Sequence, residues 1–143
     1  MQTVLIAEDS PLLRLSLSDA LERAGYLTIP AETAQGALGV LRALHVDLLL
    51  TRERLADVEG TTLAAIARHR GLDELVVVVL AEDEQEASSA LCEGVVDAVL
   101  GRHTDASSVV RVVRRLLRPV VVRPPAPIRT PAAPTAACAL PRA

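Results

Sequence analysis

Residues 46–62 read VDLLLTRERLADVEGTT, and this stretch defines the type of fold. The apolar run at 48–51 has no polar alternation, which is typical of a strand covered on both faces, as in a parallel sheet. A polar loop follows, and Gly60 closes the loop ahead of an amphipathic segment. Arg52 stands where the apolar run ends. The stretch therefore predicts a strand–loop–helix unit with a guanidinium group at the carboxyl end of its strand.

The same unit occurs five times along the chain. Apolar runs at 4–7, 26–29, 48–51, 75–81 and 97–100 precede amphipathic segments at 11–24, 34–44, 61–69, 84–92 and 106–117. Ser10 and Thr33 are expected N-caps, and Pro11 suits the first helical position. Gly25 and Gly71 lie where helices should end. Five such units predict an α/β fold with a doubly wound, five-stranded parallel sheet and right-handed crossovers.

Composition limits the classes of function. The chain has 143 residues, half of them hydrophobic, with no Lys, Asn, Phe or Trp. Cys92 and Cys138 show no metal-ligand spacing, which favours a reduced cytosol. Nothing approaches the ~20 apolar residues of a membrane span, and the chain begins without a signal peptide pattern. We expect a soluble, cytoplasmic protein that does not contact a membrane.

Charge and proline content divide the chain into two parts. Residues 1–105 hold all 18 acids and eight arginines, whereas residues 106–143 hold seven arginines and no acid. Seven of the nine prolines lie between Pro119 and Pro141. Such a composition cannot build a core. We therefore expect one domain over residues 1–118 and a flexible Pro/Ala/Arg-rich tail over residues 119–143.

Two adjacent acids follow the first predicted strand. Glu8 and Asp9 should face the crevice beyond the carboxyl ends of the strands, where open parallel sheets bind ligands. Paired carboxylates suit Mg²⁺, although they also suit the positive end of the following helix. Arg52 should lie beside them, where its guanidinium group matches carboxylates and replaces a metal as counter-charge. The alternative is that Arg52 points into solvent.

Four motifs occur in a fixed order: VLIAEDSPLLRLSLSDALERAGY (4–26), AETAQGAL (31–38), DLLLTRERLADVEG (47–60) and EGVVDAVL (93–100). This ordered set resembles the receiver domains of bacterial response regulators over roughly residues 2–118. The resemblance implies a flavodoxin-like fold with strand order 2-1-3-4-5. It also implies a place in two-component or phosphorelay signal transduction.

The resemblance places other residues where receivers carry their reactive groups. The phosphorylated aspartate of the family lies eight residues before the loop glycine, and Arg52 occupies that position. Leu80 stands where the family has Ser or Thr, Ala98 where it has an aromatic residue, and Gly101 where it has lysine. Arginine is no nucleophile, because its guanidinium stays protonated. Leu80 and Gly101 supply neither the hydroxyl nor the cation that phosphoryl transfer uses.

Only Glu8 and Asp9 remain of the family pattern, as a vestigial metal site. We therefore expect no enzymatic activity, no cofactor and the loss of Mg²⁺ binding. The expected function is that of a stand-alone pseudo-receiver, independent of phosphorylation, that acts by protein–protein contact. The resemblance implies a histidine kinase or another regulator as partner.

The last predicted helix is the candidate interface. It reads SSVVRVVRRLLRP, and its arginines are Arg111, Arg114, Arg115 and Arg118. In the family this face carries partner or dimer contacts, so the resemblance also implies a homodimer through this helix. The alternative is a core helix with a solvated basic face.

Two other functions compete with this interpretation. Glu53 is the nearest acid that could replace the phosphorylated aspartate, but adjacent strand residues face opposite sides, so the strand end would have to shift register. Nucleic acid could bind the arginines of the last helix and the tail. The acidic body and the absence of stacking aromatics make us expect no such binding.

The tail should be dispensable for folding. Truncation after Arg118 removes a segment that is poor in apolar residues, so it is expected to lower the melting temperature by no more than a few degrees. Thermal unfolding followed by circular dichroism measures the change. A larger loss would place Val120–Val122 against the body.

Overall fold

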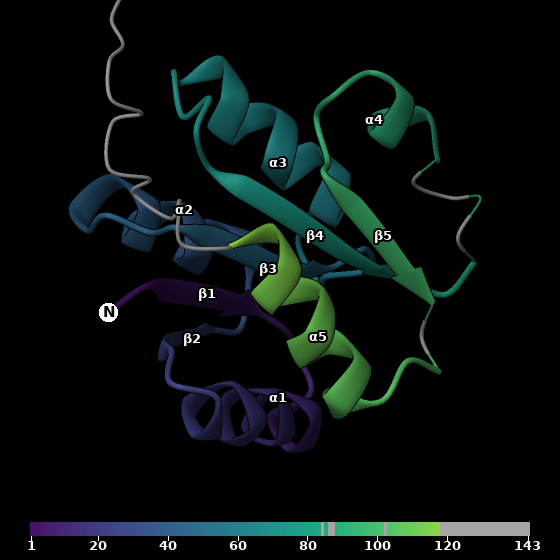
Figure 1. Ribbon diagram of the computed structural model, residues 1–143. Coiled ribbons are helices and arrows are strands. Elements are labelled where there is room, and N and C mark those ends of the chain that lie inside the picture. The colour runs from purple at the N-terminus through teal and green to yellow at the C-terminus, as the bar shows by residue number, and fades with distance from the viewer. Residues whose placement is uncertain (84, 86–87, 102, 118–143) are drawn as a thin grey trace, which may run out of the picture.

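A computed structural model describes residues 1–83, 85, 88–101 and 103–117. Strands and helices alternate: β1 (Thr3–Ala7), α1 (Pro11–Arg23), β2 (Leu27–Ala31), α2 (Ala34–Ala43), β3 (Leu48–Arg52), α3 (Gly60–His69), β4 (Val76–Ala81), α4 (Ser88–Cys92), β5 (Ala98–Gly101) and α5 (Ala106–Leu116). The strands pair in parallel in the order β2-β1-β3-β4-β5. The predicted doubly wound sheet is confirmed (Figure 1).

Helices cover both faces of the sheet, because its strands are apolar on both sides. On one face, Leu50 of β3 belongs to a core cluster with Leu21 of α1 and Val113 of α5. On the other, Leu49 belongs to a cluster with Ala37 of α2 and Leu63 of α3. Figure 1 shows α1 and α5 together on one side of the sheet and α2 and α3 on the other. Both described clusters are aliphatic apart from the partly buried Tyr26.

The predicted helix signals occupy their expected positions. Ser10 caps α1, where its hydroxyl accepts a hydrogen bond from the N–H of Leu13 at 3.4 Å. The Thr33 hydroxyl accepts one from Gly36 at 3.0 Å and caps α2. Gly25 follows α1 with a φ of 100°, a left-handed conformation that favours glycine. The predicted helix over 84–92 is a short α4 that begins at Ser88, and residues 84, 86 and 87 lie outside the described residues.

Pro30 lies within β2, an edge strand, and faces Ile6 of β1 in the register. The backbone N–H of Leu27 donates to Gln2 on the β1 side, so alternate residues of β2 direct their backbone groups to the same side. Thr28 and Pro30 therefore direct theirs to the open side. A missing N–H costs nothing there, which is why a proline is tolerated in this strand.

Several predictions fall outside the described residues, namely those on Arg118 and on the tail over residues 119–143. The tail's flexibility and its dispensability for folding stay predictions. Within the described ranges, no helix combines the length and apolarity that crossing a bilayer requires.

Gly60 permits the close approach of α3 to the end of β3. A Cβ atom at this position would meet the carbonyl oxygen of Arg52 and would lie 3.0 Å from two side-chain atoms of Thr51.

Gly60→Ala should therefore lower the free energy of unfolding by about 1–3 kcal/mol, measured by urea denaturation. Gly39→Ala is the matched control, since a Cβ there meets nothing within 4 Å. Because Gly39 lies inside α2, that change should stabilise by about 0.5–1 kcal/mol. Equal effects at both positions would contradict the steric argument.

Candidate functional site

The carboxyl ends of β1 and β3 bring an acid and an arginine together. Ala7 is paired with Thr51 in the register, so the next residues along the two strands, Glu8 and Arg52, are neighbours. Their side chains lie on the α1 and α5 side of the sheet, where one Nη atom of Arg52 is 3.4 Å from a carboxylate oxygen of Glu8. The interpretation of Arg52 as pointing into solvent is wrong, because only 23% of its side chain is exposed.

Glu8 is the buried member of the pair, with 2% of its side chain exposed. Its second carboxylate oxygen accepts a hydrogen bond from the N–H of Ser10 at 3.0 Å. Its backbone carbonyl accepts another from the guanidinium group of Arg14 at 2.7 Å. Burial raises the pKa of the Glu8 carboxyl, and the neighbouring Asp9 adds to this effect; the Ser10 N–H and the charge of Arg52 oppose it. The charged form of Glu8 therefore depends on these two donors.

Asp9 differs from Glu8 in its surroundings, because it is exposed. The two acids still interact, because burial and, to a smaller extent, the side chain of Asp9 raise the pKa of the Glu8 carboxyl. The ion pair that the structure gives Arg52 joins one Nη atom to one oxygen of Glu8.

Glu53 faces the opposite side of the sheet and binds the start of α3. Its carboxylate oxygens accept hydrogen bonds from the backbone N–H of Thr61 at 2.9 Å and from the Thr61 hydroxyl at 3.0 Å. Glu59, the residue at the N-cap position of α3, makes no side-chain capping bond, so Glu53 takes that role from the strand end. Glu53 is almost fully buried. Sequence reasoning considered this residue only as a displaced acid and missed its structural partner.

Asp57, in the loop between β3 and α3, binds the start of α2. Its carboxylate accepts hydrogen bonds from the N–H groups of Ala34 and Gln35, both at 2.9 Å, and from that of Val58 at 3.0 Å. The backbone hydrogen bonds from Ala34 and Gln35 hold the pKa of Asp57 below its usual range. Glu53 binds the start of α3 and Asp57 binds the start of α2. Together they hold the loop that follows Arg52 between these two helices. Sequence reasoning did not find this contact, because residues 34 and 57 belong to different βα units.

The remaining predicted site residues are divided between the two ends of the sheet. Leu80 is paired with Arg52 in the register, and Gly101 ends β5, so both lie at the carboxyl edge. Ala98 begins β5 and packs, half-buried, against the α1 and α5 core. Of the charged groups predicted near this edge, the structure brings together Glu8 and Arg52. Among the described residues, no group of three or more His, Cys, Asp or Glu side chains is arranged to hold a metal ion.

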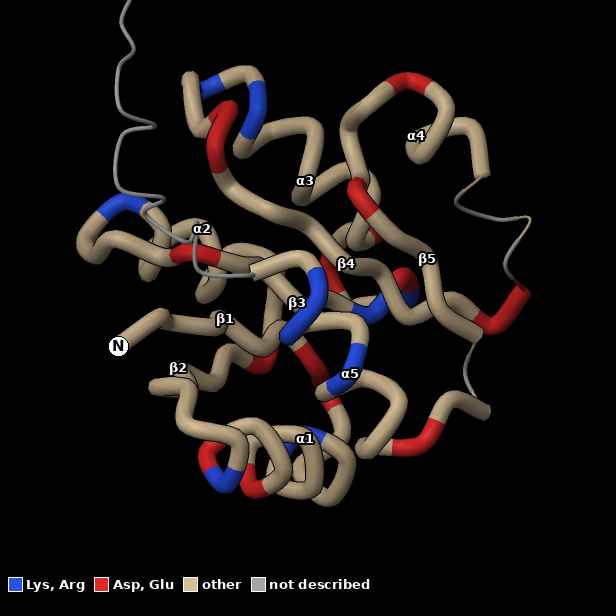
Figure 2. The backbone as a smooth tube through the Cα atoms, in the orientation of Figure 1, with Lys and Arg blue, Asp and Glu red and all other residues tan. Residues whose placement is uncertain are grey.

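The arginines of α5 are separated from this site. Val109 and Val113 turn one face of the helix into the core, whereas Arg111, Arg114 and Arg115 are exposed. Figure 2 shows this basic segment on α5. Arg118 lies outside the described residues. The described part of α5 is a core helix with a solvated basic face, and its role as an interface stays a prediction.

Removal of the Arg52 side chain should destabilise the domain in a pH-dependent way. Arg52→Ala leaves Glu8 buried without its cation, which raises the pKa of Glu8 further and costs about 1–2 kcal/mol at pH 7. The unfolded state is common to both proteins, so the loss depends on the two folded pKa values of Glu8, which both lie above the ordinary 4.5. It should grow as the pH rises through these values and vanish at lower pH, where Glu8 is protonated in both proteins. Urea denaturation from pH 3.5 to 8 measures it.

Arg23→Ala is the matched control, because Arg23 pairs with Asp19 at 3.2 Å on the surface. That change should alter stability by less than about 0.5 kcal/mol at any pH. A loss for Arg52→Ala of equal size at both ends of the pH range would mean that the side chain stabilises by packing and not by charge.

Comparison with known proteins identifies the family. The sequence pattern that defines the response regulator receiver domain family matches residues 4–113. Over 99 residues the chain is 29% identical to the sensor histidine kinase RcsC of Escherichia coli, which is 69% of this chain but 10% of the relative. The chain thus spans about a tenth of the length of the curated relatives it matches.

Solved structures agree on the fold. The response regulator TrrA from Thermotoga maritima, in complex with Mg²⁺-BeF, is similar with a TM-score of 0.73 and 22% identity, over 82% of this chain and 100% of that one. A CheY-like receiver domain from Methanospirillum hungatei has a TM-score of 0.74 and 22% identity, over 80% and 92% of the two chains. The chain therefore belongs to the response regulator receiver domain family, the signalling modules of two-component systems.

Proposed function

We propose that this receiver domain signals through protein–protein contact without accepting a phosphoryl group. The observation that carries the proposal is the ion pair between Arg52 and the buried Glu8. A guanidinium group occupies the position from which, in the family pattern, a carboxylate attacks the phosphoryl group. Because the guanidinium stays protonated at physiological pH, it cannot act as that nucleophile.

The surrounding groups support the same proposal. TrrA was crystallised with Mg²⁺-BeF bound. In this chain, Arg52 places a positive charge 3.4 Å from one oxygen of Glu8, and the other oxygen accepts a hydrogen bond from Ser10, so a divalent cation would have to approach against the charge of the guanidinium group. Leu80, beside Arg52 in the register, has no hydroxyl, and Gly101 has no cationic side chain. Arg52 supplies no oxygen ligand of the kind that Mg²⁺ requires.

The competing function, a conventional receiver that uses Glu53, receives no support from the geometry. Both oxygens of the Glu53 carboxylate are bound by Thr61 on the α3 side of the sheet. Phosphorylation there would break both bonds at a position that is 4% exposed. It would also require the carboxylate to pass to the opposite face of β3.

The proposed partners are proteins of the same signalling class. The exposed arginines of α5 offer a basic surface on an otherwise acidic domain, and residues 1–105 carry eight arginines against 18 acids. Charge complementarity of this kind steers association more than it adds affinity. A histidine kinase or another regulator with an acidic surface is the proposed partner, and a homodimer through α5 is the second arrangement.

Incubation with acetyl phosphate and Mg²⁺ tests the proposal. Intact-mass spectrometry should detect no phosphoryl adduct on the parent protein, and titration calorimetry should detect no saturable Mg²⁺ site at millimolar concentration. Arg52→Asp is the matched variant. It should gain Mg²⁺ affinity, because a third carboxylate joins the crevice. It should still be phosphorylated poorly, because Leu80 and Gly101 are unchanged. An adduct on the parent protein that maps to Glu53 or Asp57 would overturn the proposal.

A further inference from the structure

The opposite edge of the sheet carries a trough that the described site does not use. Two neighbouring hollows of about 440 Å³ each share Leu41 and Leu72 in their lining. The first lies in front of the amino ends of β3 and β4, and the second lies between α2 and α3. Leu38 of α2 and Leu44, which is 54% exposed, extend the apolar lining. We call the two hollows together the α2–α3 trough.

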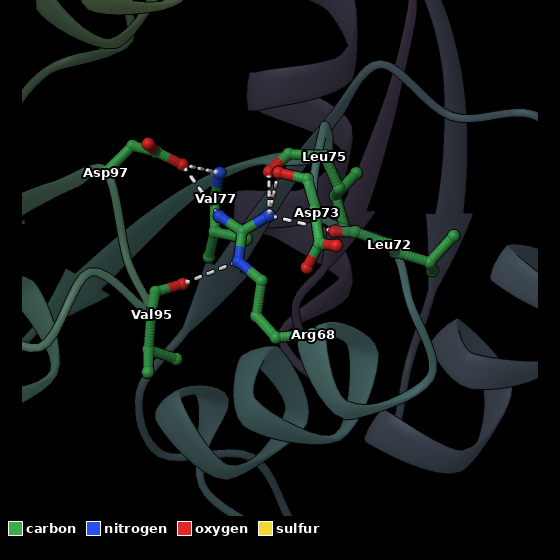
Figure 3. Close-up of polar contacts among 7 residues, drawn as sticks. All are labelled: Arg68, Leu72, Asp73, Leu75, Val77, Val95 and Asp97. Carbon is green, nitrogen blue, oxygen red and sulfur yellow. Dashed lines mark hydrogen bonds and ion pairs between the residues drawn. The ribbon is translucent and has the colours of Figure 1, made fainter.

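One wall of the trough is held rigidly by Arg68, in the last turn of α3 (Figure 3). Its guanidinium group donates to the carbonyl oxygens of Leu72 at 2.9 Å, Asp73 at 3.2 Å and Leu75. These carbonyls belong to the segment that lines the trough. The same side chain forms an ion pair with Asp97 at 3.0 Å. The wall is therefore formed before any partner arrives, which reduces the entropy lost on binding.

Val95 and Asp97 complete the fixation on the far side of Arg68. The Val95 carbonyl accepts a hydrogen bond from Nε of Arg68 at 3.3 Å. The Asp97 carboxylate also accepts one from the N–H of Val77 at 2.8 Å, at the start of β4. Arg68 thus connects the trough wall to the segment ahead of β5 and, through Asp97, to β4.

Charges on the rim are separated along the trough. Arg42 on α2 and Arg70 after α3 are the charged residues that line the hollow between the helices. Both are exposed, and among the described residues neither side chain has a hydrogen bond or ion pair. The other hollow has Asp73 and Glu74 on its rim, also exposed and with no side-chain partner in the described part of the chain. One end is therefore positive and the other negative.

These charges define the chemistry of an occupant. Its centre must be apolar to cover the leucines, since burial of apolar area is the main favourable contribution to association. Acidic groups must meet Arg42 and Arg70, and basic groups must meet the opposite end. The chain's own residues 118–143 fail this requirement, because they contain four arginines and no acid. The separated charges and the apolar lining suit a polypeptide segment better than a compact ion.

We propose, building on the protein-contact function above, that the α2–α3 trough binds an amphipathic segment of a partner protein. The segment has an apolar face flanked by acidic residues at one end and basic residues at the other. The acidic end lies against Arg42 and Arg70, and the basic end lies against Asp73 and Glu74. This surface lies at the edge of the sheet opposite the Glu8–Arg52 site and is separate from the basic face of α5.

A synthetic helical peptide is the probe, with a leucine face, glutamates at one end and lysines at the other. Titrated into ¹⁵N-labelled protein, it should give saturable shifts in the amide signals of residues 38–44 and 70–75. A second peptide of the same composition with its charges interleaved should bind about tenfold more weakly, because each cluster then meets both like and opposite charges. Thermal unfolding of the protein variants described next checks that each of them folds.

The double variant Arg42→Glu/Arg70→Glu should also weaken binding about tenfold or more. Arg23→Glu on the exposed face of α1 is the control for the single variant Arg70→Glu, because it makes the same change in net charge outside both proposed binding surfaces. The Arg23→Glu protein should bind like the parent protein. Equal affinity for the two peptides, or shifts that fall on α1 or α5 instead, would overturn the proposal. So would sedimentation data that show dimerisation lost in the Arg42/Arg70 variant, since a second copy would then be the occupant. None of these measurements depends on acetyl phosphate or Mg²⁺, so either proposal can fail alone.

Discussion

Backbone N–H groups at the ends of strands and helices constrain this domain, because each needs an acceptor once the sheet is covered on both faces. Carboxylates provide many of these acceptors. Asp47 binds the N–H of Thr3 at the start of β1, and Asp97 binds that of Val77 near the start of β4. Asp57 binds the first N–H groups of α2. The acids hold the loops at both edges of the sheet to its elements.

This use of carboxylates explains why an acidic domain need not be a cation-binding domain. Glu53 and Asp105 also accept hydrogen bonds from backbone N–H groups at helix starts, those of Thr61 and Ser108. Asparagine, which otherwise shares such positions with aspartate, is absent from the chain. The Glu8–Arg52 pair differs, because its carboxylate is buried deeply enough to need a cation as well as an N–H donor. Charge is neutralised inside the molecule at the one edge where receivers usually recruit a metal.

The elements and their order could be predicted from the sequence because they depend on local pattern. The apolar runs around Leu49 and Val78, together with caps such as Ser10 and Thr33, predict boundaries within about two residues of those observed, except for α4, whose predicted start is residue 84 and which begins at Ser88. Position also sufficed for the contact between Glu8 and Arg52, since both follow adjacent parallel strands. These features need no knowledge of how side chains pack.

The side-chain contacts across units could not be predicted in this way. Asp57 and Ala34 are 23 residues apart, and Arg68 and Asp97 are 29 apart. Nothing in the local pattern distinguishes Arg68 from the exposed Arg70 two residues later; only the packed loop does. Glu53 presented the same difficulty, because its neighbours in the sequence suggest a crevice and its contacts in space belong to α3. Long-range geometry determines which charges become structural.

Pro30 has a consequence for the behaviour of the protein at high concentration. Unpaired edges of sheets are the sites at which chains add to one another and begin to form fibrils. On the outer side of β2, Thr28 retains an N–H group while Pro30 has none, so an incoming strand meets an interrupted row of donors. The β5 edge has no proline, and its four residues are all partly exposed. Intermolecular sheet growth in a concentrated or partly unfolded sample is therefore directed to β5. The β2 edge acts as a barrier to aggregation.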